Sequence, residues 1–485
     1  MKRFFRIFVI AIAATTMFSG CHKENPEPKD TSDYLYFEAV EAGATVSMKM
    51  VGKMEAPTLV FSTNKLDWTK FDFSNPQTIT LENVGDKVYW RNADKTDHFS
   101  ENYENYVRFV SGEKKLAAGG NIMSLIDGSC QSLTIPSNYC FCALFALNSS
   151  LVSAPCLPAT ELSPACYFNM FSGCSSLEEA PELPAMQLTH TCYYAMFNGC
   201  TSLKKAPELP ATKLDYACYF SMFFECSSLE EAPELPATEL AEFCYQQMFH
   251  SCSSLRKAPG ILPAEELKNA CYSVMFNSCT SLENAPEMKA TTLATECCYC
   301  MFSNCPALKE APALPATKLA ENCYMGMFQG CVLFKQAPEL PATLLADGCY
   351  SNMFCWCTAM ETVPVLPASQ LAPRCYEFMF ENCSSLKNIK VAFEDWGDGT
   401  ATAGWVSEVA AKGIFECPES LEVKYGYDYI PEGWNVNGAV TPQGPSPLEI
   451  SAASTAKSSA ELSPKQIVPD KLRLRKHSAP ELIGM

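Results

Sequence analysis

Cysteine is the residue type whose number and spacing in this sequence first suggest chemistry. The chain of 485 residues contains 27 cysteines, many of them followed by an aromatic residue at intervals of 25 to 27 positions. A zinc site needs four ligands that converge once, so metal binding is an alternative only at the irregular clusters 297–300 (CCYC) and 355–357 (CWC). The regular repetition favours a structural role instead, because cysteine is among the most buried residue types.

Two cysteines in each repeat flank a Met-Phe pair. The four residues fall at i, i+4, i+5 and i+8, as in Cys218, Met222, Phe223 and Cys226. Because these offsets share one face of a helix, they predict a short amphipathic helix or helical turn with that face inward. Tyr219 should lie beside it with its hydroxyl in water. The two predicted structural columns consist of Cys140, Cys166, Cys174, Cys192, Cys200, Cys218, Cys226, Cys244, Cys252, Cys271, Cys279, Cys298, Cys305, Cys323, Cys331, Cys349, Cys357, Cys375 and Cys383.

These columns allow two redox states. Outside the reducing cytosol disulfides can persist, and copies stacked about 5 Å apart would bring column neighbours within bridging separation. Their Cβ vectors would be parallel, however, which is poor geometry for a bridge. We therefore expect mostly free, buried thiols, with disulfides as the alternative.

The repeat determines the architecture. Ten copies of a pattern close to C-Y-x-x-M-F-x-x-C-x-S-L-x-x-A-P-x-L-P-A-T-x-L recur with a period near 26 residues. One or two helical turns are not stable alone, so stacked neighbours must supply the buried contacts. The second half, SLEEAPELPAT, carries two prolines without N–H groups and predicts very short parallel strands. We expect an α/β repeat solenoid over residues 119–390, in which short helical turns alternate with short parallel strands.

The residue after the SL leucine indicates how the copies stack. Its charge alternates along the chain, and seven of the eight adjacent pairs have opposite signs. If consecutive copies lie in register about 4.8 Å apart, like charges would face each other unless the sequence alternated. The alternation predicts an unstaggered stack, in which each exposed pair contributes roughly a few tenths of a kcal/mol. These residues are Glu178, Lys204, Glu230, Arg256, Glu283, Lys309, Lys335, Glu361 and Lys387.

The repeat core resembles the BspA-like leucine-rich repeat family, whose copies carry Phe-x-x-Cys-x-x-Leu. Here the core reads MFSGCSSL at 170–177, MFNGCTSL at 196–203 and MFENCSSL at 379–386, and the resemblance extends over residues 125–390. It implies a curved leucine-rich solenoid displayed on a bacterial surface as an adhesin or interaction protein. The proline-rich APELPAT half departs from the family's usual strand.

The N-terminus has the features of a bacterial lipoprotein signal. Three basic residues precede a 12-residue apolar run, which is too short to span a bilayer and is typical of a secretory signal. The motif FSGC, ending at Cys21, resembles a lipobox with phenylalanine in place of the usual leucine. We expect residues 1–20 to be removed, lipid on Cys21 to anchor the protein to the outer membrane at the cell surface, and residues 21–33 to form a tether. An ordinary signal peptide is the alternative.

The segments that flank the repeats have other patterns. Residues 34–118 alternate apolar and polar residues between turn signals, which predicts an antiparallel β-sandwich-like domain. Residues 391–436 predict a C-terminal cap with a helix, a strand and a Trp-containing end. The Ser-, Pro- and Ala-rich residues 437–485 predict a disordered tail.

Charge and histidine content exclude several function classes. Loss of the three basic signal residues lowers the formal net charge from −18 to −21, so nucleic acid and anionic lipid are poor partners. The five histidines are scattered, and none is placed to serve a cysteine as a general base. No glycine-rich phosphate loop occurs. We therefore predict no enzymatic activity, no metal and no cofactor.

The predicted function is that of a protein-binding or adhesion module, because a solenoid offers a large rigid face with variable positions at fixed spacing. The expected partner is a protein on a host or neighbouring cell. The alternative is a carbohydrate-capture lipoprotein, with the N-terminal domain as the glycan site and the solenoid as a spacer. Trp68, Tyr89 and Trp90 would then line the glycan-binding face, and their competing role is aromatic packing in the core.

Overall fold

The computed structural model describes residues 33–96 and 99–437. By its internal contacts the chain separates into two units, Met1–Thr441 and Pro442–Met485, and the described residues all belong to the first. The predicted signal peptide, the predicted lipidation residue Cys21 and the predicted tail beyond residue 437 lie outside the described residues.

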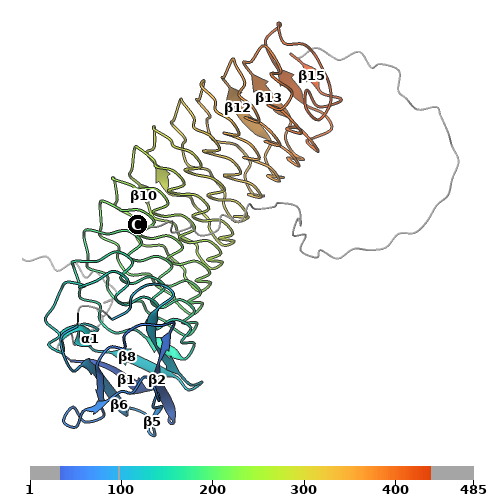
Figure 1. The fold of residues 1–485 in the computed structure, drawn as a ribbon. Helices are drawn as coiled ribbons and strands as arrows, with labels where there is room; N and C mark the ends of the chain where they lie inside the picture. The colour runs from blue at the N-terminus through green and yellow to red at the C-terminus, as the bar shows by residue number, and fades with distance from the viewer. Residues whose placement is uncertain (1–32, 97–98, 438–485) are drawn as a thin grey trace, which may run out of the picture. The chain divides into compact units, whose positions relative to one another are not determined.

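Two β-sheets form the N-terminal part, at the blue end of Figure 1. One has the strand order β4-β3-β6-β1-β8-β9 and the other β5-β2-β7. All pairings in them are antiparallel except that of β8 with β9. Alternating burial along β1 and β6 confirms the predicted N-terminal sheets. The strands are β1 (Leu35–Ala39), β2 (Ala44–Val51), β3 (Leu59–Ser62), β4 (Thr69–Lys70), β5 (Ile79–Leu81), β6 (Lys87–Asn92), β7 (Tyr106–Ser111), β8 (Leu116–Gly119) and β9 (Leu151–Ser153).

Aromatic side chains join the two sheets. The ring of Phe109 in β7 lies 4.7 Å from that of Phe37 in β1 and 5.2 Å from that of Trp90 in β6, measured between centroids. All three side chains have 0% exposure. The sheets therefore pack face to face around an aromatic core.

The core of the sheets continues into the repeats. β9 pairs in parallel with β8, and Phe109 stacks on Phe145 of the first repeat at 5.6 Å. The short helix α1 (Ser124–Asp127), which ends at left-handed Gly128 (φ 68°), lies between these strands in the chain. Buried residues of both regions belong to one hydrophobic cluster, so the sheets cover the apolar end of the first repeat as a terminal cap does.

The repeats form coils that stack in sequence order (Figure 1). The cysteine-containing half of each coil is not helical: among the described residues α1 is the only α-helix, so the predicted helical turns are wrong. The N–H of Tyr219 donates to the carbonyl of Cys244 in the next coil (3.0 Å), whereas the N–H of Phe220 donates to the carbonyl of Ala217 in its own coil (3.2 Å). This alternation continues along the segment, so half of the N–H groups close tight turns and half join coils.

We call these stacked segments the turn ladder; in one coil it comprises residues 216–226. Every fourth residue has a left-handed backbone, with φ of 49°, 51° and 58° at Ala217, Ser221 and Glu225. A four-residue turn brings positions i, i+4 and i+8 to one side, as a helix does, which is why the spacing indicated a helix. Each left-handed residue other than glycine costs roughly 1–2 kcal/mol, and the hydrogen bonds between coils and the burial of the core offset this cost.

The rest of each coil, named here the strand side, confirms the predicted very short parallel strands. Most coils meet through single parallel bridges, such as that of Glu179 with Lys205. The ladder of β13 with β14, which lack proline, is unbroken, whereas that of β12 with β13 shifts register between Thr362 and Val365, around Pro364, because proline has no N–H for the ladder. The strands here are β10 (Ile261–Leu262), β11 (Glu287–Met288), β12 (Thr362–Leu366), β13 (Asn388–Val391), β14 (Ile414–Glu416) and β15 (Asn435–Val436).

Consecutive coils lie in register on the strand side. The N–H of Lys204 donates to the carbonyl of Glu178 (3.3 Å), and that of Lys309 to the carbonyl of Glu283 (3.4 Å). The side chains of the same two pairs form ion pairs of 3.5 and 2.9 Å. These contacts confirm the unstaggered stack predicted from the alternating charges.

The C-terminal cap begins with one more coil instead of the predicted helix. The N–H of Tyr376 donates to the carbonyl of Ala401 (2.8 Å), which extends the turn ladder into a segment without cysteine. β14 and β15 then supply the strands of the cap. The indole N–H groups of Trp396, Trp405 and Trp434 each donate to a backbone carbonyl at 2.6 to 2.8 Å, so three large rings with satisfied polar atoms close the core.

Candidate functional site

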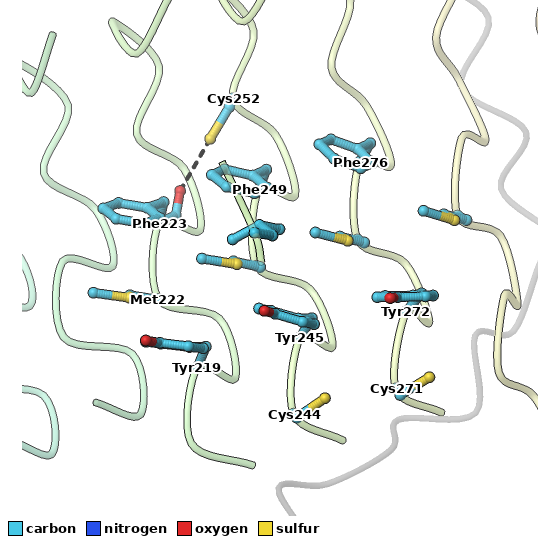
Figure 2. Close-up of a cluster of buried hydrophobic side chains, with 14 of the residues drawn as sticks. Tyr219, Met222, Phe223, Cys244, Tyr245, Phe249, Cys252, Cys271, Tyr272 and Phe276 are labelled. Atoms are coloured by element: carbon cyan, nitrogen blue, oxygen red, sulfur yellow. Dashed lines mark hydrogen bonds between the residues drawn. The ribbon is translucent and has the colours of Figure 1, made fainter. Parts of the chain in front are cut away.

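The predicted cysteine columns lie in the interior of the coils. Each of these cysteines has 0% exposure, and the cysteines that the structure describes are free thiols. In the second column the thiol donates to the phenylalanine carbonyl of the preceding coil, with S···O distances of 3.0 to 3.3 Å. Figure 2 shows this bond from Cys252 to Phe223. The thiols therefore link successive coils through a donor that alanine lacks.

The structure corrects the position of one column member, Cys298. The N–H of Tyr272 donates to the carbonyl of Cys297 (2.9 Å), just as the N–H of Tyr219 donates to the first-column cysteine Cys244 of the next coil (3.0 Å). The N–H of Cys298 donates to the carbonyl of Cys323 (3.0 Å), as a ladder tyrosine would. The sequence CCYC permits both registers, and Cys297 is the one that stands four residues before Met301. Cys297 therefore belongs to the first column, and Cys298 occupies a tyrosine position.

Burial keeps the column thiols protonated. Desolvation raises the pKa of Cys192 and of Cys244 to about 12 and raises the pKa of Cys200 well above its ordinary value, because a thiolate in the apolar interior would lack solvation. A nucleophilic cysteine needs a lowered pKa. The columns are suited to donate hydrogen bonds rather than to attack a substrate.

Two stacks of rings lie between the cysteine columns (Figure 2). Phenylalanines of successive coils stack with centroids 5.1 to 6.1 Å apart and planes within 9°, and Tyr219 stacks on Tyr245 at 5.7 Å. Tyr219 has 1% exposure, and burial raises its pKa well above the ordinary value. The predicted water-exposed hydroxyl is therefore wrong. The tyrosine stack is interrupted at Cys298, between Tyr272 and Tyr324.

The remaining side chains of the turn ladder face outward, and in adjacent coils they form an aromatic patch. Three outward positions lie two residues before, two residues after and six residues after the first cysteine of a coil. The left-handed residue that follows each of these positions also faces outward. Most of these rings are half-buried. The aromatic patch consists of Tyr139, Phe168, His190, Tyr194, Tyr216, Phe220, Phe224, Phe243 and His250.

The central row of the patch runs along the stacking direction. Phe168 stacks on Tyr194 at 4.6 Å and Tyr194 on Phe220 at 4.7 Å, with planes within 7° of parallel. Tyr139 extends the row at 6.1 Å from Phe168. Because the stacked rings cover each other's faces, mainly ring edges are left for a ligand.

Two shorter rows flank the central row. His190 stacks on Tyr216 at 4.8 Å, and Phe243 meets Tyr216 edge-on at 5.5 Å. Phe224 stacks on His250 at 4.9 Å. Burial lowers the pKa of His250, so its ring is neutral at pH 7 and adds to the apolar surface.

Three acidic residues border the patch. Asp215, Glu225 and Glu242 are exposed, and none forms an ion pair with a lysine or arginine of the described residues. Glu242 adds to burial in raising the pKa of Tyr216, which places its charge near that ring. The patch therefore combines apolar ring edges with uncompensated negative charge.

The outward positions change character after residue 250. Asn269, Ser273 and Asn277 occupy the three positions in the next coil. Later coils carry separate exposed rings at Trp356 (46%) and Phe378 (37%). The fold of the coil therefore does not require aromatic residues at the outward positions. Their concentration between residues 139 and 250 needs another explanation.

A second aromatic surface lies on the N-terminal sheets. Of the three rings considered for glycan binding, Trp90 packs in the core with 0% exposure, whereas Trp68 and Tyr89 are half-buried at the surface. The guanidinium of Arg91 lies 4.5 Å from the Trp68 ring centroid, and the ammonium of Lys65 lies 4.5 Å from that of Tyr89. Cations thus occupy ring faces on which a sugar would stack.

A shallow cleft of about 240 Å³ lies on the same sheet, between Tyr36, Glu38, Gly119 and Ser153. Tyr36 lies across Gly119, where an added Cβ would approach its ring to 2.4 Å. Lys87 lies 4.3 Å from the centroid of that ring. The glycine is required by this close packing, and the ring is held between backbone and cation.

The described residues contain neither a cluster of metal ligands nor a membrane-spanning helix. No group of three or more His, Cys, Asp or Glu side chains there is arranged to hold a metal ion. Residues 33–96 and 99–437 also contain no helix that is long and apolar enough to cross a bilayer.

Comparisons with known proteins give one structural likeness. No protein-family model matches the chain, and no curated protein matches it. The crystal structure of a leucine-rich repeat protein from Bacteroides ovatus is similar over 58% of this chain and 66% of that chain, with 20% sequence identity and a TM-score of 0.31. The match thus spans just under two thirds of that protein. Membership of the BspA-like family stays a prediction from the sequence motifs, and the repeat architecture rests on the hydrogen bonds and stacking described above.

The aromatic patch is the feature that the sequence reasoning missed, although the sequence contains its signal. Of the three outward offsets, rings occupy one in the copy that begins at Cys166, two in that of Cys192 and all three in that of Cys218, and they give way to Asn and Ser in the copy of Cys271. The inward residues are nearly the same in every copy, so a pattern based on them does not reveal this difference between the outward residues. The outward residues vary between copies, and the rings of the patch gather among them.

Proposed function

We propose that the protein is a non-enzymatic binding module that holds another protein on the aromatic patch. The observation that carries this proposal is the concentration of nine outward rings on adjacent coils, whereas the later coils carry only the separate rings Tyr299, Trp356 and Phe378. Aromatic residues are enriched at the centres of protein interfaces, where they contribute most of the binding energy. Contiguous exposed apolar surface is rare on monomers that bind nothing.

The turn ladder is suited to present such rings to a partner. Each left-handed turn fixes the backbone on both sides of an outward residue, and its N–H groups are bonded within the coil or to the next one. The rings are also fixed by stacking on each other. A preorganised surface loses little conformational entropy on binding, so a modest area can give specific affinity.

A paired substitution tests this proposal. The double variant Tyr216→Ser/Phe224→Ser removes two outward rings from the patch, and Trp356→Ser/Phe378→Ser removes two exposed rings elsewhere on the ladder as the control. Pull-downs from a membrane extract of candidate target cells, with the secreted chain as bait, would be compared by mass spectrometry. We expect proteins that the wild type and the control capture to be lost from the patch variant. Equal capture by all three chains would refute the proposal.

We further propose that lipid on Cys21 holds the module at the outer surface of the cell. The support is the basic and apolar N-terminal sequence that ends in FSGC, followed by the polar residues 22–33. Cys21→Ser should abolish incorporation of labelled fatty acid and move the protein from the membrane to the soluble fraction. Retention of label in this variant would exclude lipidation at Cys21.

Glycan capture by the N-terminal sheets is the second candidate function. It is favoured by the half-buried rings of Trp68 and Tyr89 and by the cleft at Tyr36, whose ring lies 5.7 Å from that of Tyr89. It is disfavoured by the cations over the rings of Trp68, Tyr89 and Tyr36. A glycan array probed with the whole secreted chain and with its Trp68→Ala variant tests it. Binding that Trp68→Ala abolishes and Tyr216→Ser/Phe224→Ser preserves would favour this function over the first.

A further inference from the structure

We infer that the partner presents to the aromatic patch a basic polypeptide segment, in which lysine or arginine alternates with apolar residues. This inference rests on the proposed function and adds the chemical class of the ligand. Three observations lead to it: the orientation of the rings, the charge at their border and the charge of the whole chain.

The ring orientation favours a polypeptide over a carbohydrate. Sugars bind aromatic residues by stacking on a ring face. In the central row Tyr194 lies between Phe168 and Phe220 at 4.6 and 4.7 Å, nearly parallel to both, so both of its faces are covered. The row instead presents parallel apolar ring edges, against which aliphatic side chains and the methylene stems of lysine and arginine can pack.

The border of the patch sets the charge of the ligand. Asp215, Glu225 and Glu242 stand next in sequence to Tyr216, Phe224 and Phe243. By contrast, Lys213 on the strand side is paired with Glu239 at 3.0 Å. Asp215 accepts the N–H of Tyr216 at 2.7 Å and Glu242 the side-chain amide of Asn269 at 2.8 Å, so each carboxylate keeps acceptor capacity. A lysine or arginine whose stem lies along a ring edge would place its charged group beside one of the three carboxylates, which gives a charge-assisted hydrogen bond.

The negative charge of the whole chain disfavours three other occupants of the patch. A second copy of this chain carries the same formal net charge of −18, and like charges across an interface cost several kcal/mol. Nucleic acid and anionic lipid would meet the same repulsion. A basic polypeptide segment is attracted by the patch border and by the rest of the acidic surface.

The experiment uses the secreted full chain and a fluorescein-labelled decapeptide of alternating leucine and arginine, with an alternating leucine and glutamate decapeptide as the reference. Binding is measured by fluorescence anisotropy in 0.15 and 0.5 M NaCl. The variant Asp215→Asn/Glu225→Gln/Glu242→Gln removes the border charges. The control Glu182→Gln/Glu208→Gln/Glu339→Gln removes three exposed carboxylates from the strand side and changes the net charge equally.

We expect the basic peptide to bind, the border variant to weaken it at least tenfold, and the control variant to change it less than twofold. Salt should weaken it strongly, because ion pairs at the surface are screened. Equal weakening by both variants would show attraction to net charge alone and would overturn the inference, as would equal binding of the acidic peptide or no binding of the basic one. In each of these cases, loss of captured protein from Tyr216→Ser/Phe224→Ser would still support the proposed function, so the two failures are distinguishable.

Discussion

A thiol at the second-column position fills a fully buried site and also joins two coils. In the second repeat the carbonyl of Phe171 accepts the N–H of Cys174 in its own coil at 3.0 Å and the thiol of Cys200 in the next coil at 3.2 Å. Alanine would fill part of the space without the donor, and serine would keep a donor with a shorter reach. The thiol is therefore retained for its shape and its weak S–H bond together.

Cys200→Ala should lower the free energy of unfolding by about 1 kcal/mol. The loss is modest because the carbonyl of Phe171 keeps its bond from Cys174. Urea unfolding in the presence of a reductant measures it. The half-buried Cys417, for which the structure shows no such thiol bond, provides the control, and Cys417→Ala should shift stability by less than about 0.5 kcal/mol. If Cys200→Ala is as stable as the wild type, the thiol bond does not stabilise the stack.

The adjacent Cys297 and Cys298 permit a direct test of the corrected register. Cys298→Tyr should be tolerated and should raise the melting temperature, because it restores a ring between Tyr272 and Tyr324 in the tyrosine stack. Cys297→Tyr should cost about 1–3 kcal/mol or more, because it places a ring in a filled column of small side chains. Thermal unfolding of both variants decides the matter. The opposite order of stability would mean that Cys298 is the column cysteine.

The coil is the element that sequence reasoning could predict in part. Its length, its inward residues and its register follow from periodicity, from residue types such as Met222 and Phe223, and from the alternating charges after each SL leucine. The backbone conformation of the coil cannot be predicted from the periodicity, because a four-residue turn and an α-helix bring the same positions inward. The two structures differ in the left-handed φ of residues such as Ser221 and Glu225. Because these residues are not glycine, the local sequence does not indicate a left-handed backbone. The hydrogen bonds that offset its cost come from the neighbouring coils.

The charge column gives a prediction at the same scale. Lys204→Glu would place a carboxylate in register between Glu178 and Glu230, in place of the 3.5 Å ion pair with Glu178, and should cost about 0.5 kcal/mol in 20 mM salt. The exchange Glu178→Lys/Lys204→Glu restores the first pair and should recover about half of this loss. The difference between the two variants should shrink in 0.5 M NaCl, where the charges are screened. Urea unfolding at both salt concentrations checks it, and no recovery in the double variant would argue against pairing in register.

At the scale of the whole molecule, the interior is a long series of acids that must stay neutral. Burial raises the pKa of thiols such as Cys192 from 9.0 to about 12 and raises the pKa of tyrosines such as Tyr193 well above 10.0. The unfolded chain has the ordinary values. As the pH rises through 9, the unfolded state therefore releases protons that the folded state retains, and the free energy of unfolding falls.

The molecule should accordingly lose stability steeply above pH 9, by up to about 1.4 kcal/mol per pH unit for each linked group. Melting temperatures measured by circular dichroism at pH 7, 8, 9 and 10, with a phosphine reductant present, should be nearly constant at first and then drop. A flat profile to pH 10 would contradict the buried, protonated columns. The aromatic patch contains few of these groups, so Tyr216→Ser/Phe224→Ser should leave the shape of the profile unchanged.

The register of the charge column also restricts how such a chain can change in length. The turn ladder is a one-dimensional array that repeats once per coil, because every coil presents nearly the same donors, acceptors and rings to its neighbours. Duplication or deletion of a copy needs no new interface in the interior. The alternating charges favour the gain or loss of an even number of copies. One extra copy brings two like charges together at a junction, whereas two extra copies preserve the alternation. Lys309 and Lys335 are the one like-charged pair of neighbours in the column, and they have the charge pattern that insertion or deletion of a single copy would leave.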